Sequence, residues 1–87
     1  MQSSSIQKGE LMTLFFRSMD QKMNCSIKCF NTDTFNRVEQ LLYKSFPEYK
    51  KTNNYFICEA NKINEYKTIE ENGLKNNSLI LMICNWN

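Results

Sequence analysis

Residues 31–42 read NTDTFNRVEQLL, and the apolar pattern of the chain changes at this stretch. Before it, apolar and polar residues alternate, which is typical of a half-buried strand. After it, apolar residues recur every three or four positions, which is typical of one face of a helix. Asp33 and Thr34 are both suited to accept hydrogen bonds from the free N–H groups of a first helical turn. The stretch therefore predicts the end of a strand and the start of a helix.

The predicted helix carries one apolar stripe and ends at a proline. The stripe consists of Phe35, Val38, Leu41, Leu42 and Phe46. Pro47 ends the helix because the residue before a proline is pushed out of the helical region. A helix of about three turns with a single apolar stripe needs an apolar surface to lie on. We therefore expect this helix to cover one face of a sheet.

Two alternating segments precede the helix and are typical of a hairpin. In residues 11–19, one side of the strand carries Met12, Leu14 and Phe16. In residues 24–30, one side carries Cys25, Ile27 and Cys29. The polar segment between them contains Asp20, a residue type that tolerates tight-turn backbone angles. The apolar side of this hairpin is the expected seat of the helix.

Three further strands are expected after the helix, at residues 55–59, 63–66 and 79–84, the second of them short. The segment before the last strand is irregular, and Gly73 is expected there at a positive φ angle. The last strand is apolar throughout, so it is either central or leaves an apolar face outside. The sequence therefore predicts an α+β domain of ββαββ type, with one main helix on one face of a mixed sheet.

The order and spacing of these segments resemble the ubiquitin-like β-grasp family. The similarity runs from about residue 11 to residue 84 through MTLFFRSM, NTDTFNRVEQLL, YFICEANKI and TIEENGLKNNSLILMI. No single motif carries it. The resemblance implies that the first and last strands run parallel at the centre of the sheet. It also implies a core formed by Leu14, Phe16, Ile27, Val38, Leu42, Phe56, Ile63, Ile69, Leu74, Leu79, Leu81 and Ile83.

The resemblance further implies an apolar docking patch on the side of the sheet away from the helix. Its expected residues are Phe15, Met19, Ile57, Ile80 and Met82. Successive side chains of a strand point to opposite faces, so assigning Leu79 and Leu81 to the core sends their neighbours outward. Exposed patches of several large apolar side chains are typical of binding surfaces. We therefore expect a protein–protein interaction module whose partner is another protein or another domain of a larger protein.

The sequence departs from ubiquitin in three ways. The chain ends ICNWN, without the paired glycines that a conjugated modifier carries at its C-terminus. The turn between the first two strands is one residue longer, and Asn72 or a neighbour stands where ubiquitin has a buried tyrosine. We therefore expect a domain that is not conjugated to other proteins.

Two alternative functions remain open. In the first, the same apolar face is permanently covered in a larger assembly, and the domain is structural. In the second, the domain binds RNA, since basic residues beside aromatic rings can bind single strands. The candidate residues for this are Lys44, Tyr49, Lys50, Lys51 and Tyr55. A formal net charge of +2 gives the RNA interpretation little support.

Catalysis and metal binding also have little support. The chain has no histidine, which is the commonest general base, and its two glycines form no phosphate-binding loop. Cys25 and Cys29 are four residues apart on a strand, about 13 Å by strand rise, which is too far for one metal ion to join them. We expect no catalytic residues, no metal and no cofactor.

The compartment and the domain limits complete the expectations. The four cysteines lie within apolar patterns, and the N-terminus lacks the layout of a secretory signal. We therefore expect reduced thiols and an intracellular protein, cytoplasmic or nuclear. No apolar run approaches the length of about 18 residues that marks a membrane-spanning helix. Residues 1–10 are expected to form a flexible leader, residues 11–84 the domain, and residues 85–87 a tail.

Overall fold

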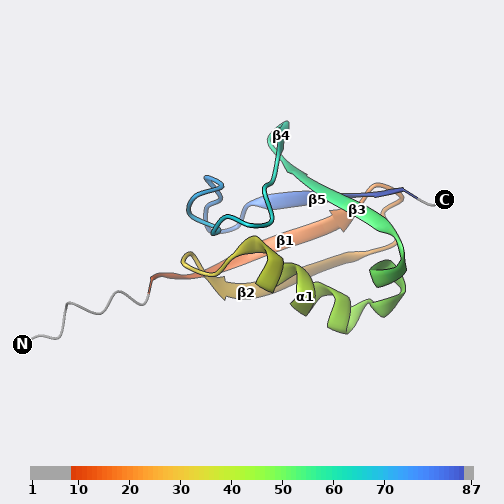
Figure 1. Ribbon diagram of the computed structural model, residues 1–87, viewed down its shortest axis with the longest axis horizontal. Helices are drawn as coiled ribbons and strands as arrows, with labels where there is room; N and C mark the ends of the chain where they lie inside the picture. Colours follow the sequence, from red (N-terminus) through yellow and green to blue (C-terminus); the bar gives the residue numbers. More distant parts are fainter. Residues whose placement is uncertain (1–8, 86–87) are drawn as a thin grey trace, which may run out of the picture.

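The computed structural model describes residues 9–85, which form one mixed sheet with a helix packed on one face (Figure 1). In chain order the elements are β1 (Leu11–Ser18), β2 (Asn24–Phe30), α1 (Phe35–Ser45), the 3-10 helix η1 (Pro47–Lys51), β3 (Asn53–Cys58), β4 (Asn61–Lys62) and β5 (Leu79–Asn85). The predicted α+β class is confirmed. Residues 1–8 of the predicted leader and residues 86–87 of the predicted tail lie outside the described residues.

The strand order in the sheet is β2-β1-β5-β3-β4. The two strands β1 and β5 run parallel at its centre, with Phe16 beside Ile80, and the other neighbouring strands are antiparallel. A parallel pair needs a long crossover connection, and the chain from β2 to β5, with α1 in it, supplies one. The expected parallel pairing of the first and last strands is therefore confirmed.

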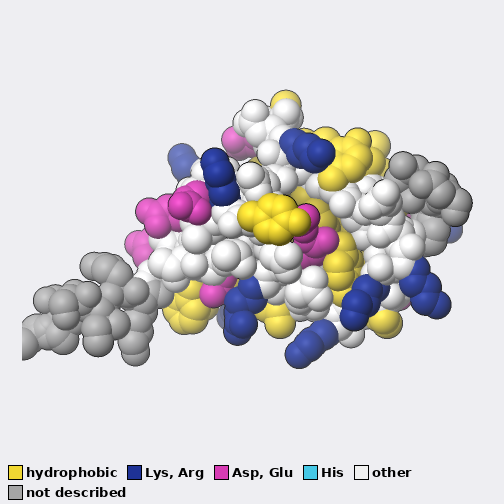
Figure 2. All heavy atoms as spheres, viewed as in Figure 1, with side chains coloured by type: hydrophobic (Ala, Val, Ile, Leu, Met, Phe, Trp, Pro, Cys, Tyr) yellow, Lys and Arg dark blue, Asp and Glu magenta, His cyan; other side chains and the backbone are white. Residues whose placement is uncertain are grey.

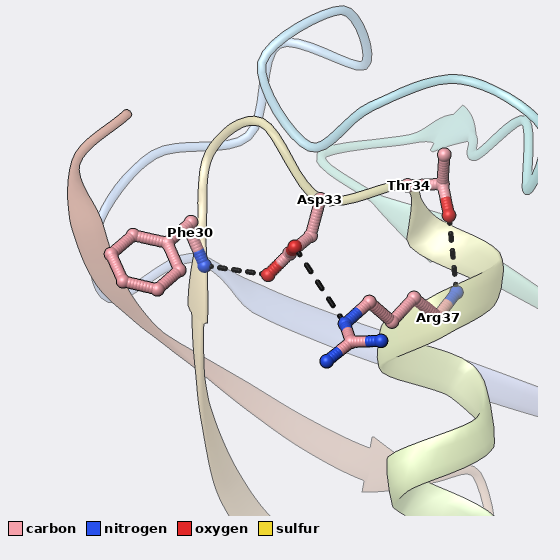
Figure 3. A network of polar contacts seen from close by, with 4 residues as sticks. All are labelled: Phe30, Asp33, Thr34 and Arg37. Atoms are coloured by element: carbon pink, nitrogen blue, oxygen red, sulfur yellow. Dashed lines mark hydrogen bonds and ion pairs between the residues drawn. The ribbon is translucent and has the colours of Figure 1, made fainter. Parts of the chain in front are cut away.

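Two neighbouring side chains fix the start of α1: one accepts a hydrogen bond from the helix that follows, and the other from the end of the strand that precedes it (Figure 3). The Thr34 hydroxyl accepts a hydrogen bond from the backbone N–H of Arg37 at 3.3 Å and is the N-cap. The Asp33 carboxylate accepts a hydrogen bond from the backbone N–H of Phe30 at 2.8 Å, and its other oxygen lies 3.7 Å from the Arg37 Nε. Thr34 therefore begins the helix, while Asp33 closes the turn that follows β2. The helix ends at Ser45, before Pro47, as predicted.

The core lies between α1 and the sheet. The ring centroid of Phe35, on α1, lies 6.1 Å from that of Phe16 on β1 and 5.0 Å from that of Phe56 on β3. The rings of Phe16 and Phe56 meet edge to face, an arrangement that aromatic pairs favour. Val38 and Leu42 extend this contact along the helix and are fully buried. Of the expected core residues, the structure buries Leu14, Phe16, Val38, Leu42, Phe56, Ile63, Ile69 and Leu74, and half-buries Ile27.

The prediction for the faces of β5 is wrong. Ile80 and Met82 were expected on the outer patch, and both are fully buried beneath the helix. Leu79, Leu81 and Ile83 were expected in the core, but Leu79 is 43% exposed and the other two are half-buried on the opposite face. A shift of one residue exchanges the two faces of a strand. Because every residue from Leu79 to Cys84 is apolar, the strand itself contains no signal that sets its register.

The short strand after β3 is also displaced from its expected position. It comprises only Asn61–Lys62, whereas residues 63–66 were expected to form it. Glu59 and Ala60 take positive φ angles of 51° and 69°, which make the β3–β4 turn tight enough for the strand to begin early. Ile63 then serves as a buried anchor rather than as part of a strand. The positive φ of Gly73 is confirmed, at 75°.

The cap at Thr34 gives a first testable prediction. Thr34→Ala removes the hydroxyl acceptor and is expected to lower the free energy of unfolding by about 1 kcal/mol. Thr34→Ser keeps the acceptor and should stay within about 0.5 kcal/mol of the wild type. Urea denaturation of the three proteins measures both values. Equal stability of Thr34→Ala and wild type would show that the cap does not hold the helix start.

A second prediction tests the register of β5. Ile80→Ala leaves a cavity under the helix and should lower the free energy of unfolding by about 2–5 kcal/mol, whereas Leu79→Ala should lower it by under about 1 kcal/mol. If Ile80→Ala is too unstable to measure, Ile80→Val should still lower it by about 1 kcal/mol. Denaturant titration measures each difference. A larger loss at Leu79 than at Ile80 would contradict the observed register.

Candidate interaction surface

The face of the sheet opposite α1 carries a continuous set of large apolar side chains. They project from three neighbouring strands, and we call them the outer apolar patch: Phe15 of β1, Tyr55 and Ile57 of β3, and Leu79, Leu81 and Ile83 of β5. The two helices lie on the other side of the sheet (Figure 1). The patch is therefore built on β-strands, which hold side chains more rigidly than loops do.

Cross-strand pairing makes these side chains neighbours. Phe15 lies beside Leu79 in the parallel pair, and Leu81 lies beside Ile57 in the antiparallel pair. Side chains that are opposite each other on one face of adjacent strands are close enough to touch. The patch is therefore one apolar surface and not a scatter of single exposed residues, which would need no explanation.

Exposure differs between the rim and the middle of the patch. Phe15 is 39% exposed, Tyr55 is 41% exposed and Leu79 is 43% exposed. Ile57 and Leu81, on the facing strands β3 and β5, are half-buried. A partner that covers the rim residues would remove the largest apolar area from water, and burial of apolar area is the main driving force of association.

Only part of this surface was predicted correctly from the sequence. Phe15 and Ile57 were predicted to face outward, and they belong to the patch. Met19 is 61% exposed, but it lies in the turn after β1, where it lines a small depression with Cys84. Ile80 and Met82 do not belong to the surface because they are buried. The three apolar residues of β5 that do belong to it were missed, since only the pairing with β1 reveals their orientation.

The charged side chains at the outward positions of the described strands are all basic. On the described strands, the outward positions hold Arg17 on β1, Lys28 on β2 and Lys62 on β4, and no Asp or Glu. Arg17 lies beside Leu81, so one positive charge directly borders the patch. The Lys62 ammonium lies 5.2 Å from the centroid of the Tyr55 ring, within range of a cation–π contact. The outer apolar patch therefore has a positively charged border.

The cysteines do not contribute to this surface. All four are free; Cys29 is buried and the others are half-buried against the core beneath the helix. Burial, with a smaller contribution from the charge of Asp33, raises the pKa of Cys29 to about 11. Burial also raises the pKa of Cys25, Cys58 and Cys84. Neutral thiols are weak nucleophiles, so at neutral pH these side chains act as small apolar groups.

The expected RNA-binding residues do not form one surface. On the side shown in Figure 2, basic side chains gather over α1 and η1. However, Tyr49 of η1 is only 5% exposed, and a buried ring cannot stack on a base. Tyr55 is exposed, but it points to the face of the sheet opposite α1. Neither aromatic ring therefore lies beside the basic side chains of α1 and η1 in a position to stack on a base.

No group of three or more His, Cys, Asp or Glu side chains within residues 9–85 is placed to hold a metal ion. No helix in the same range is long and apolar enough to span a bilayer.

Comparison of the sequence with protein-family models and with curated proteins finds no match.

A third prediction tests whether the outer apolar patch is open to solvent. A soluble paramagnetic probe should broaden the methyl NMR signals of Ile57, Leu79 and Leu81, and leave those of Ile80 and Met82 sharp. The reason is that broadening falls steeply with distance from the probe, which cannot enter the core. Protection of both sets at low protein concentration would show that the patch is covered, and a concentration series would identify self-association as the cause.

Proposed function

We propose that this chain is a ubiquitin-like domain that acts as a non-enzymatic protein-interaction module through the outer apolar patch. The observation that carries the proposal is the row of side chains on β1, β5 and β3 that the fold leaves outside: six large apolar residues that are adjacent by strand pairing. Such a surface is costly for a free domain, because it lowers solubility, and is typical of binding sites. The mixed sheet with parallel central strands and one helix is compatible with the β-grasp topology.

The charged border gives the chemistry of the partner. We expect a protein segment with an apolar centre and carboxylates around it, because Arg17, Lys28 and Lys62 surround the patch without an acidic neighbour on the strands. An apolar centre within a polar rim is the usual anatomy of a protein interface. Complementary charge mainly accelerates the encounter with the partner and disfavours basic partners. It adds less to the affinity.

A second candidate function is structural, with the same face permanently covered inside a larger protein or assembly. The observation that favours it is the composition of β5, whose outward side carries only apolar residues from Leu79 to Ile83. Obligate interfaces are more apolar than transient ones. The two candidates differ in how the isolated chain behaves: a docking module remains monomeric at micromolar concentration, while a permanently covered domain self-associates or precipitates.

A fourth prediction tests the proposed surface. Partners should be captured on immobilised wild-type protein and identified, and each purified partner should then be titrated against variants. Leu81→Ser is expected to weaken binding at least about tenfold, since residues at the centre of an interface carry most of the binding energy. Leu41→Ser, which changes an exposed leucine on α1, is the matched control and should alter the dissociation constant by less than about twofold.

The same experiment can contradict the proposal. A partner that is lost on Leu41→Ser and retained on Leu81→Ser would place the binding site on the helix. Both variants must first show a wild-type free energy of unfolding, to within about 1 kcal/mol, so that the comparison reports binding and not folding.

A further inference from the structure

A polar cluster lies within the otherwise apolar contact between α1 and β3. Glu39 of α1 is only 8% exposed, although it is a charged residue type. Its Oε2 accepts a 2.6 Å hydrogen bond from the Tyr43 hydroxyl. Asn54 of β3 donates a 2.9 Å hydrogen bond to that same hydroxyl oxygen. The single hydroxyl hydrogen of Tyr43 is therefore directed at Glu39, so one of the two carboxyl oxygens has a hydrogen-bond donor.

The other oxygen of this carboxyl group has no donor. Glu39 Oε1 is buried and has no hydrogen-bond partner within the described part of the chain. A second carboxyl group, that of Glu65, lies within hydrogen-bonding reach of the Glu39 side chain and lines the same cavity of about 140 Å³. Two carboxylates cannot hydrogen-bond to each other, because neither has a hydrogen to donate. One proton placed between them would satisfy the buried oxygen.

The remaining neighbours do not supply that hydrogen. Tyr43, on the helix itself, is already committed to the other oxygen. Asn54 and Tyr55 reach the cavity from β3, and Asn54 donates to Tyr43 and to the Tyr49 carbonyl. Lys62 reaches it from β4, but its ammonium lies over the Tyr55 ring, and no ion pair joins it to Glu39 among residues 9–85.

We propose that Glu39 is protonated in the folded protein and donates a hydrogen bond to Glu65, and that this shared proton fastens the segment after β4 to the start of α1. Burial is the main cause that raises the pKa of Glu39, to about 7, and the Glu65 carboxyl adds to it. The hydrogen bond from Tyr43 opposes the shift by stabilising the ionised form. Burial also raises the pKa of Tyr43, so its hydroxyl keeps the hydrogen that it donates.

The segment that the proton fastens also completes the helix start. The Glu65 carbonyl accepts a hydrogen bond from the backbone N–H of Asn36 at 2.9 Å, and the Lys67 carbonyl accepts one from Phe35, also at 2.9 Å. N–H groups of a first helical turn have no partner within their own helix, so these two depend on the segment. Loss of the proton would leave two facing carboxylates that repel each other and push the segment off the helix.

The direction of the pH dependence follows from the two states of the chain. In the folded protein Glu39 keeps its proton up to about pH 7, and in the unfolded chain it loses it near its ordinary value of 4.5. Below pH 4.5 both states are protonated, so the proton contributes its full stabilisation. Between these values only the folded state holds it, so stability falls as the pH rises, by at most about tenfold in the folding equilibrium constant per pH unit. Above about pH 7 this stabilisation is lost, and the dependence levels off.

The first test is a pH titration of the glutamate side-chain carboxyl carbons by NMR on the wild-type chain. We expect the Glu39 signal to titrate with a midpoint near 7, accompanied by a change at Glu65 at the same pH. Glu65→Gln should lower the Glu39 midpoint, since it removes the repelling charge but not the burial. Titration of every glutamate in the ordinary acid range would overturn the proposal.

The second test uses Glu39→Gln, whose amide can donate to Glu65 permanently and still accept from Tyr43. We expect this variant to lose the fall in stability between pH 4.5 and 7 that the wild type shows. Glu70→Gln, which changes an exposed glutamate, is the matched control and should keep the wild-type slope. Equal slopes in wild type and Glu39→Gln would show that Glu39 carries no proton on folding.

Hydrogen exchange distinguishes a local fastening from a global effect. After correction for the intrinsic rate, protection of the Asn36 amide in the wild type should fall at least about tenfold between about pH 5.5 and about pH 7.5, and stay constant in Glu39→Gln. The amides of β1 should lose protection in parallel, because global unfolding releases the same proton, but their opening free energy should stay above that of Asn36 at every pH, because they are exposed only by global unfolding. Equal opening free energies at Asn36 and in β1 across this pH range would overturn the fastening of the segment, since the segment would then open only together with the whole domain.

Discussion

The parallel pairing of β1 with β5 is the constraint on which the rest of the molecule depends. It sets Phe16 beside Ile80 and Phe15 beside Leu79, and thereby decides which side chains of an entirely apolar strand lie under the helix. The inner set completes the core around the rings of Phe35 and Phe56. Within residues 9–85, no helix covers the outer set. The same pairing that gives the domain its core therefore also produces its outer apolar patch.

This arrangement separates folding from the proposed binding function. The inner side chains of β5 are fully buried and stabilise the domain. The outer ones contribute less to the stability of the free domain, since about 40% of the surface of Leu79 and Tyr55 stays in water. Substitutions on the two faces should therefore have different effects: inner changes unfold the chain, and outer changes alter its associations. A strand with this division can keep an apolar surface without making the fold depend on its partner.

The Glu39 cluster and the outer apolar patch place side chains in opposite environments. The patch leaves apolar surface in water, whereas the cluster removes a carboxyl group from water and is tolerated only if a hydrogen satisfies its second oxygen. Tyr55 and Lys62 line the cavity beside the cluster and also belong to the outer side of the sheet. A change in the charge of the cluster would thus alter the electrostatic potential at one edge of the proposed binding surface. β3 contributes to both features, with Asn54 in the cluster and Tyr55 in the patch, because its alternate side chains face the helix and the solvent.

The sequence by itself determined the elements whose signals are local. The polar stretch at residues 32–34, the helical spacing after it and Pro47 set the bounds of α1, and alternation set the faces of β1 and β2. Only the tertiary structure decided the faces of β5, because a strand that is apolar on both sides takes its register from its neighbours. It also decided that Glu39 is buried opposite Glu65, since these residues are 26 positions apart and meet only when the segment after β4 folds back on α1. Side-chain periodicity is a local property, whereas strand pairing and burial are set by contacts between distant segments.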